Sequence, residues 1–307
     1  MYWESVVFII VYVFAVCFLL AGIRRKLKAR IQGRVGPPVL QPFYDFLKLL
    51  TKNASLPKNA SWVYIYAPVI GLSFAFVAAV ITPLAYLGPL AFAGDVIVIF
   101  LLLAASSVSL ILGGLASSNP YSGIAASRGL ILLIGMEVPL ALFVSSLYLA
   151  TGSLDIEGIM EELVHQRILY VYLAPTLVAL MVYAIGKTWT NPFSIPNAET
   201  EIMEGPMIEY SGGMLAMAEL SHFLELYVLV GLLADMLTPL VISDPVFKVA
   251  SVLAYTVILL VLIVVMSVID SIFARLRADQ ALKVLFILPT ILSIFSVLSL
   301  IIMRWML

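Results

Sequence analysis

Five titratable side chains stand inside apolar stretches of this sequence, where they could take up and pass on protons. Glu137 lies in the segment GMEVPL, and Glu219, His222, Glu225 and Asp235 follow in a later apolar run. Each charge at membrane depth costs roughly 2.5–3.5 kcal/mol on insertion scales, so each needs a reason to be there. Carboxylates surrounded by apolar groups or by one another bind protons near neutral pH. The set therefore predicts a proton relay.

The spacing of three of these residues supports the relay. Glu219, His222 and Glu225 recur at every third position, so successive offsets of about 60° keep them on one face of a helix. Asp235 continues the same helix toward its far end. The alternative is structural, with each group neutral and hydrogen-bonded between helices, although Ser or Asn would serve that purpose at lower cost.

The segment that precedes this helix, residues 189–213, is acidic, and the basic residue beside it is Lys187. It carries four glutamates, Glu199, Glu201, Glu204 and Glu209. It also carries prolines and apolar residues, which indicate a packed segment: Pro192, Ile195, Pro196, Ile202, Met203 and Met207. We expect it to present carboxylates to a funnel that leads toward Glu219. The alternative is a simple solvated acidic loop.

The composition places the chain in a membrane. Of its 307 residues, 63% are hydrophobic and 11% are charged, too few charges for the surface of a soluble domain. The net charge of -1 argues against a nucleic-acid partner. One cysteine, Cys17, and two distant histidines, His165 and His222, argue against a disulfide framework, an iron–sulfur cluster or a zinc site. We therefore expect no metal and no redox cofactor on this chain.

About eight apolar runs are long enough to cross a bilayer, which takes about 20 helical residues. Backbone groups in hydrocarbon must be satisfied within the segment, so these runs predict helices. The expected fold is all-α: a polytopic integral membrane protein in which residues 1–307 form a single membrane domain. Basic residues rather than a cleavage site follow the first run, which we interpret as a membrane helix. The predicted spans are Tyr2–Gly22, Tyr64–Leu87, Asp95–Ala116, Ala125–Ala150, Ile168–Thr188, Met214–Leu237, Val246–Ile269 and Val284–Met306.

Basic residues are concentrated in two of the loops, and this asymmetry predicts the orientation. Loops rich in Lys and Arg face the cytoplasm. We therefore expect a multi-pass protein of the cell (plasma) membrane with both termini on the outer side. The basic positions of the first loop and of the loop after the seventh span are Arg24, Arg25, Lys26, Lys28, Arg30, Arg34, Lys48, Lys52, Lys58, Arg275, Arg277 and Lys283.

A shorter amphipathic stretch, residues 42–52, lies between the first two spans. Its apolar residues recur at helical spacing on one face and its charged residues occupy the other. We expect a helix in the cytoplasmic interface, with its lysines toward headgroups or a partner; the alternative is a plain surface anchor. The apolar positions are Phe43, Phe46, Leu47 and Leu50, and the charged positions are Asp45, Lys48 and Lys52.

Three stretches resemble hallmarks of the complex I subunit 1 family, the membrane subunit that forms much of the quinone cavity in complex I. They are ARIQGRVGPPVLQPFYDFLKLLTK, ASRGLILLIGMEVPLALF and NPFSIPNAETEIMEGPMIEYSGG, in the order the family shows. The uninterrupted GPPVLQP and the EGP element are typical of the branch in energy-converting membrane-bound [NiFe] hydrogenases, formate hydrogenlyases and related archaeal sulfane reductase complexes. His222 stands where complex I members carry a glutamate.

The resemblance implies a coupling role rather than an active site. The subunit would dock a soluble arm with a hydrogenase-like large subunit and an iron–sulfur small subunit, beside antiporter-like membrane subunits and lipid. Electron transfer in that arm, on cofactors held by the partners, would drive proton or sodium movement. The glutamates of residues 189–213 would form the entrance, and Glu137, Glu219 and Glu225 the relay. The residues that would dock or orient are Arg34, Arg128, Asp45 and Lys48.

Three other functions remain as alternatives. One is the quinone-binding subunit of a complex I-type NADH or ferredoxin dehydrogenase, and another is a passive membrane anchor for a soluble arm. The third is an independent ion or solute carrier, against which the lack of internal repeats argues.

Overall fold

In the computed structural model, residues 2–82, 92–203, 205–240 and 248–306 are described, and they form helices and loops without a strand. Within these ranges, eight helices are long and apolar enough to cross a membrane. This result confirms the predicted all-α, multi-pass fold. The eight are α1 (Tyr2–Ile31), α3 (Trp62–Ile81), α4 (Asp95–Leu115), α5 (Pro120–Thr151), α7 (Leu169–Lys187), α9 (Gly212–Leu237), α10 (Lys248–Ile272) and α11 (Ala278–Met306).

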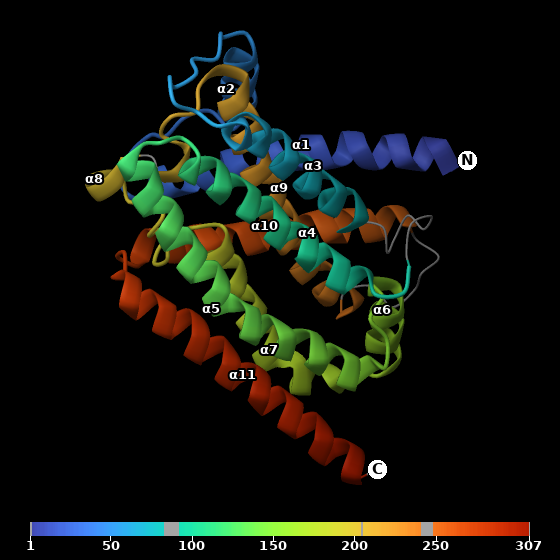
Figure 1. Ribbon diagram of the computed structural model, residues 1–307. Helices are drawn as coiled ribbons and strands as arrows, with labels where there is room; N and C mark the ends of the chain where they lie inside the picture. The colour runs from blue at the N-terminus through green and yellow to red at the C-terminus, as the bar shows by residue number, and fades with distance from the viewer. Residues whose placement is uncertain (1, 83–91, 204, 241–247, 307) are drawn as a thin grey trace.

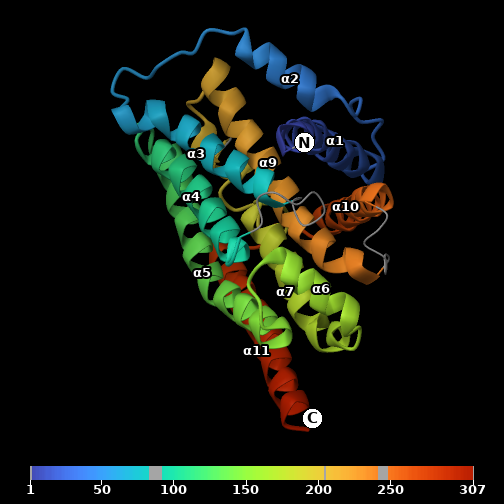
Figure 2. The same cartoon turned by 90° about the vertical axis from the view of Figure 1, so that its right-hand side faces the viewer.

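Helix α9 forms the centre of the bundle. In its most apolar stretch, 83% of the residues are buried, against 28% for α10 and for α11. It packs against α1, α3, α7 and α10, while α4 lies on α3, and α11 lies along α5 and α7 (Figures 1 and 2). Side chains carried by α9 are therefore enclosed by neighbouring helices, which makes it the element best placed to hold buried titratable groups.

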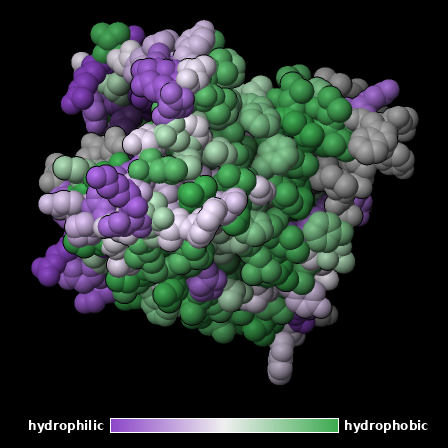
Figure 3. Space-filling model, turned by 45° about the horizontal axis from the view of Figure 1, so that its top comes forward, coloured by the Kyte–Doolittle hydropathy of each residue, from purple (hydrophilic) through white to green (hydrophobic). Residues whose placement is uncertain are grey.

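The two ends of the bundle differ in character. Both chain termini lie at the end that carries α6 (Ile156–His165), opposite the end that carries α8 (Glu199–Ile202) (Figure 1). Hydrophilic residues gather over the α8 end, whereas hydrophobic residues cover much of the flank between the two ends (Figure 3). An apolar belt with one strongly polar end is the arrangement expected of a membrane protein that meets water or a partner at that end.

Several elements differ from the predicted boundaries. Helix α1 continues to Ile31, so the basic residues assigned to the first loop begin on its last turns. Helix α5 starts at Pro120 because the Asn119 side chain accepts a hydrogen bond from the Tyr121 amide at 2.9 Å. The ten-residue helix α6 was not predicted; Asp155 caps it. The predicted span ends at 83–87 and 246–247 lie outside the described residues.

The amphipathic stretch forms α2 (Gln41–Leu50), as predicted, with Pro42 in its first turn. Phe18 of α1 contacts Phe43 and Phe46, with ring centroids 5.4 and 5.5 Å apart. These contacts hold α2 beside α1 and α9 (Figure 2). Helix α2 is therefore a packed part of the bundle's polar end.

Residues 189–213 are also folded, through α8 and a 3-10 turn, η2 (Gly205–Met207). Ile195, Ile202 and Met207 are buried, as the packed-segment interpretation predicts. Met203 is the exception, because its side chain is exposed. A second 3-10 turn, η3 (Thr238–Leu240), follows α9 at the opposite end.

Candidate functional site

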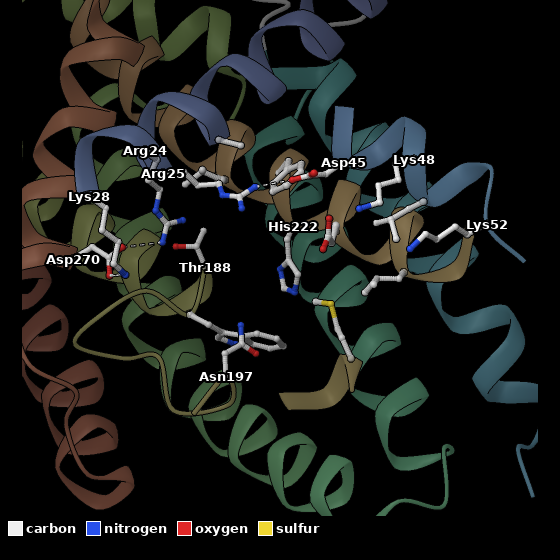
Figure 4. Close-up of a pocket in the computed structure, with 18 residues that line it drawn as sticks. Arg24, Arg25, Lys28, Asp45, Lys48, Lys52, Thr188, Asn197, His222 and Asp270 are labelled. Atoms are coloured by element: carbon white, nitrogen blue, oxygen red, sulfur yellow. Dashed lines mark hydrogen bonds and ion pairs between the residues drawn. The ribbon is translucent and has the colours of Figure 1, made fainter. Parts of the chain in front are cut away.

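A cavity of about 620 Å³ opens at the polar end of the bundle, between α1, α2, α9, the end of α10 and the segment after α7. Apolar walls such as Leu49, Phe223 and Leu226 alternate with charged groups. Figure 4 shows arginine and lysine side chains from α1 and α2 around the opening and His222 inside it. The charged and titratable lining residues are Arg24, Arg25, Lys28, Asp45, Lys48, Lys52, Glu219, His222 and Asp270.

Asp270 organises one wall of this cavity, although the sequence analysis did not single it out. Its side chain is 3% exposed and lies 3.0 Å from Lys28 Nζ and 3.4 Å from an Arg24 guanidinium nitrogen. The Asn191 backbone amide donates to the same carboxylate at 3.2 Å. One carboxylate thus joins α1, α10 and the start of the 189–213 segment. A lone acidic residue near the end of an apolar run was the available signal.

The opposite wall carries the charged face of α2. Arg25 of α1 lies 3.1 Å from Asp45, which also accepts a hydrogen bond from Gln41 at 2.8 Å. Lys48 and Lys52 extend toward the cavity (Figure 4). The charged face of α2 is therefore turned toward the bundle, which corrects the expectation that its lysines point away to headgroups or a partner.

The inner end of the cavity leads to a fully buried carboxylate. Glu219 and His222 line the cavity, and Glu225, one turn further along α9, is 0% exposed. His222 Nδ1 lies 3.5 Å from Glu225 Oε2, and the Ser107 hydroxyl donates to Glu225 Oε1 at 3.0 Å. The predicted face of α9 therefore exists, and it runs from the open cavity into the bundle interior.

Lys187 is the residue that sequence reasoning missed, because it was treated as a loop charge. It ends α7, is 2% exposed, and its Nζ has no hydrogen-bond partner within the described part of the chain. The charges that act on it are those of Glu225 and Glu137. A buried ammonium placed between two carboxylates can pass charge changes from one to the other.

Glu137 does not lie where the sequence analysis placed it. It sits midway along α5 with its side chain exposed on the surface of the bundle. Its charge nevertheless acts on Tyr183 and Lys187 of α7. Glu225, Lys187 and Glu137 thus connect the interior to a lateral surface.

Asp235 is separated from this group. It is 0% exposed, but it lies ten positions beyond Glu225, about 15 Å along a helix. The groups whose charges interact with it are Asp95 and the tyrosines Tyr12 and Tyr255. It therefore belongs to a second polar cluster in the other half of the bundle.

The glutamates of residues 189–213 do not form the expected funnel. The Arg128 guanidinium lies 2.7 Å from Glu201, and this hydrogen bond and positive charge lower the pKa of Glu201 below its ordinary value. Glu209 accepts a hydrogen bond from Asn119. Neither lines the cavity, to which the segment contributes Asn197 and Met207 instead.

The remaining predicted positions are distributed as follows. The Glu199 side chain and Glu204 lie outside the described residues. Arg128 is held by Glu201, whereas Arg34 is exposed in a turn that contains two glycines at positive φ, Gly33 and Gly36. Within the described ranges, no three His, Cys, Asp or Glu residues are placed to hold a metal ion. The absence of a cofactor stays a prediction.

Comparison with known proteins gives consistent matches. Residues 3–301 match the family described as NADH dehydrogenase. A membrane subunit of the NADH-quinone oxidoreductase of Geobacillus sp. (strain WCH70) is 32% identical over 220 residues, or 68% of this chain and 65% of that protein. The Thermomicrobium roseum protein of the same name is 34% identical over 238 residues, or 68% and 69%. The Bacillus cytotoxicus protein is 30% identical, and the match spans 63% of its length.

A solved structure is similar over nearly the whole chain. It is part of the membrane-bound sulfane sulfur reductase, described as an archaeal respiratory membrane complex. The TM-score is 0.86 at 26% sequence identity, with 97% of this chain and 99% of that chain covered. The fold, including all the elements that surround the cavity, is therefore shared with a subunit of a respiratory complex.

Proposed function

This chain belongs to the NADH dehydrogenase family, as complex I subunit 1, and on that premise we propose that it couples electron transfer in a soluble arm to ion translocation. The subunit itself carries out no redox step. It docks a hydrogenase-like arm, and the arm's turnover drives protons or sodium ions across the membrane. Similarity to the sulfane sulfur reductase structure supports a membrane-bound sulfane reductase or hydrogenase as the parent complex.

The observation that carries the proposal is the buried series His222, Glu225 and Lys187 behind the cavity. Three titratable groups inside a bundle are costly unless their charges are used or compensated. The cavity gives His222 access to the polar end, while Glu225 and Lys187 are 0% and 2% exposed. A change of charge at the cavity can therefore shift protonation deeper in the bundle. The relay then continues through Lys187 to Glu137 at the lateral surface.

The partners follow from the two faces that the relay joins. The polar end, with exposed Arg34 and the basic cavity rim, would receive the large subunit and the iron–sulfur small subunit, which hold the redox cofactors. The surface around Glu137 would contact antiporter-like membrane subunits. We place the polar end in the cytoplasm because basic residues gather there, which puts both termini outside the plasma membrane.

This orientation can be measured by cysteine labelling. With Cys17 replaced by Ala, single cysteines at 24–60 and 190–213 should react with an impermeant reagent from the cytoplasmic side. Cysteines at 152–166 should react from outside. Labelling of 152–166 from the cytoplasm would reverse the orientation and with it the docking face.

The coupling itself is tested by Glu225→Gln in the assembled complex, with ion uptake and redox turnover measured on the same membrane vesicles. Glutamine keeps the shape and hydrogen bonding of glutamate but cannot titrate, so it avoids the cavity that alanine leaves. We expect ion uptake per electron pair to fall while turnover with an artificial donor is retained. Glu161→Gln, an exposed position on α6, is the matched control and should change neither. Full uptake in Glu225→Gln would leave only an anchoring role.

A second candidate function is quinone binding, which the apolar walls of the 620 Å³ cavity and its polar inner end favour. A quinone would place its ring near His222 and its tail along Phe223 and Leu226. A photoreactive quinone analogue bound to the complex distinguishes the two. Labelling of α9 that His222→Phe removes would support this candidate, and labelling elsewhere would reject it.

A further inference from the structure

The half of α9 beyond Glu225 presents a second file of polar groups. Tyr227, Gly231 and Asp235 recur at intervals of four residues, so they lie one above another on one face of the helix. Apolar residues fill the other positions of this stretch. The file spans eight residues, about 12 Å of helix.

Two neighbouring helices bring further hydroxyls to this face. An added Cβ at Gly231 would lie 2.7 Å from the Tyr255 hydroxyl of α10, so the glycine makes room for that group one turn from Asp235. Tyr227 and Tyr255 are neighbours, and Tyr12 of α1 interacts with both Asp235 and Tyr227. One carboxyl and three phenols from α1, α9 and α10 therefore share one buried volume.

This volume contains groups whose hydrogen-bonding capacity is unused. Asp235 is 0% exposed, and within the described chain neither of its oxygens has a hydrogen-bond partner; the same holds for the Tyr12 hydroxyl. The charge that acts on Asp235 is that of another carboxylate, Asp95 of α4. An isolated carboxylate in such surroundings is stable only when it binds a proton or a cation, since no basic side chain of the described residues compensates it.

We propose that Asp235 and the hydroxyls of Tyr12, Tyr227 and Tyr255 form a second proton site, in which Asp235 holds an exchangeable proton for the outer half of the membrane. This inference rests on the proposed coupling function and adds a site that is separate from Glu225. The proton is the fitting ligand because Asp235 has tyrosine hydroxyls rather than cations around it. Gly231 keeps the Tyr255 hydroxyl in line.

Proton transfer along this file balances without another reactant. Asp235 donates its proton toward the outer end and becomes a carboxylate. It regains a proton from the nearest phenol, which at the same time accepts one from the next hydroxyl in the file. Each phenol therefore ends with the proton count it began with, and Asp235 is the group that alternates in charge.

The first test is the protonation state of Asp235 in the purified complex. Infrared spectra of the complex and of its Asp235→Asn variant should differ by one carboxylic-acid carbonyl band that shifts in heavy water. A difference that shows only carboxylate bands would overturn the inference. Because this measurement needs no ion transport, its outcome does not depend on the coupling function.

The second test is the path. Gly231→Ala leaves every titratable group in place but displaces the Tyr255 hydroxyl, so we expect ion uptake to be lost while artificial-donor turnover is retained. Tyr255→Phe should act in the same way and does not require the helices to move apart. Tyr172→Phe in α7, away from this file, is the matched control. Normal uptake in both variants, with loss in Glu225→Gln, would reject the second site alone; normal uptake in Glu225→Gln as well would reject the coupling function.

Discussion

His222 Nδ1 lies 3.5 Å from Glu225 Oε2, which joins a side chain that lines the cavity to one with no exposed surface. The Trp189 ring packs edge-on against the imidazole, with centroids 4.9 Å apart. The contact fixes the imidazole at the boundary between the cavity and the bundle interior. Any charge that enters the relay from the polar end therefore meets His222 before Glu225.

The first prediction concerns the charge balance behind this contact. Glu225→Leu should destabilise the protein by roughly 3–5 kcal/mol, because it leaves Lys187 buried with less opposite charge. Adding Lys187→Met should restore much of that loss, since the uncompensated charge is then gone. Thermal unfolding of the two single variants and the double variant in detergent measures the coupling. Additive effects would show that the two residues do not compensate each other.

The second prediction concerns the ion pair between Arg128 and Glu201, which are 2.7 Å apart. Because Arg128 lowers the pKa of Glu201 in the folded chain, the pair contributes its full stability above the ordinary glutamate pKa of 4.5. That contribution is lost as the pH falls through the lowered value. Hydrogen exchange in α8, corrected for the intrinsic effect of pH, should therefore increase in the acid range. In Glu201→Gln the acid step should be missing.

The fold was largely predictable because long apolar runs specify membrane helices by themselves. Helix α6 was missed because it has only ten residues and mixed composition. The direction of Glu137 could not be predicted, since a helix that is apolar on all sides carries no periodic signal for its buried face. Lys187 and Asp270 were missed for another reason. The contact between Lys28 and Asp270 joins residues 242 positions apart, and no local pattern contains such a pairing.

The third prediction tests Asp270 as the organiser of the cavity wall. Asp270→Asn keeps the size of the side chain but removes the charge that Arg24 and Lys28 share. It also allows an amide to face the Asn191 backbone amide, so we expect a loss of roughly 1–3 kcal/mol and faster proteolysis of residues 189–213. Asp279→Asn removes an exposed ion pair with Arg277 and is the control, with an expected effect of about 0–1 kcal/mol. Equal effects of the two variants would contradict a special role for Asp270.

The last prediction concerns Glu137, whose exposed side chain lies midway along a membrane-spanning helix. A carboxylate facing lipid at that depth costs roughly 2.5–3.5 kcal/mol, so the native complex should cover it with another membrane subunit. Ile134 and Val138 are exposed beside it, and cysteines placed there should react with a membrane-permeant maleimide in the isolated chain. In the complex they should be protected. A cysteine at Val257 on α10, which is 58% exposed, gives the comparison with another face of the bundle. Equal labelling of 134 and 138 in both preparations would mean that Glu137 faces lipid, and the relay could not leave the subunit there.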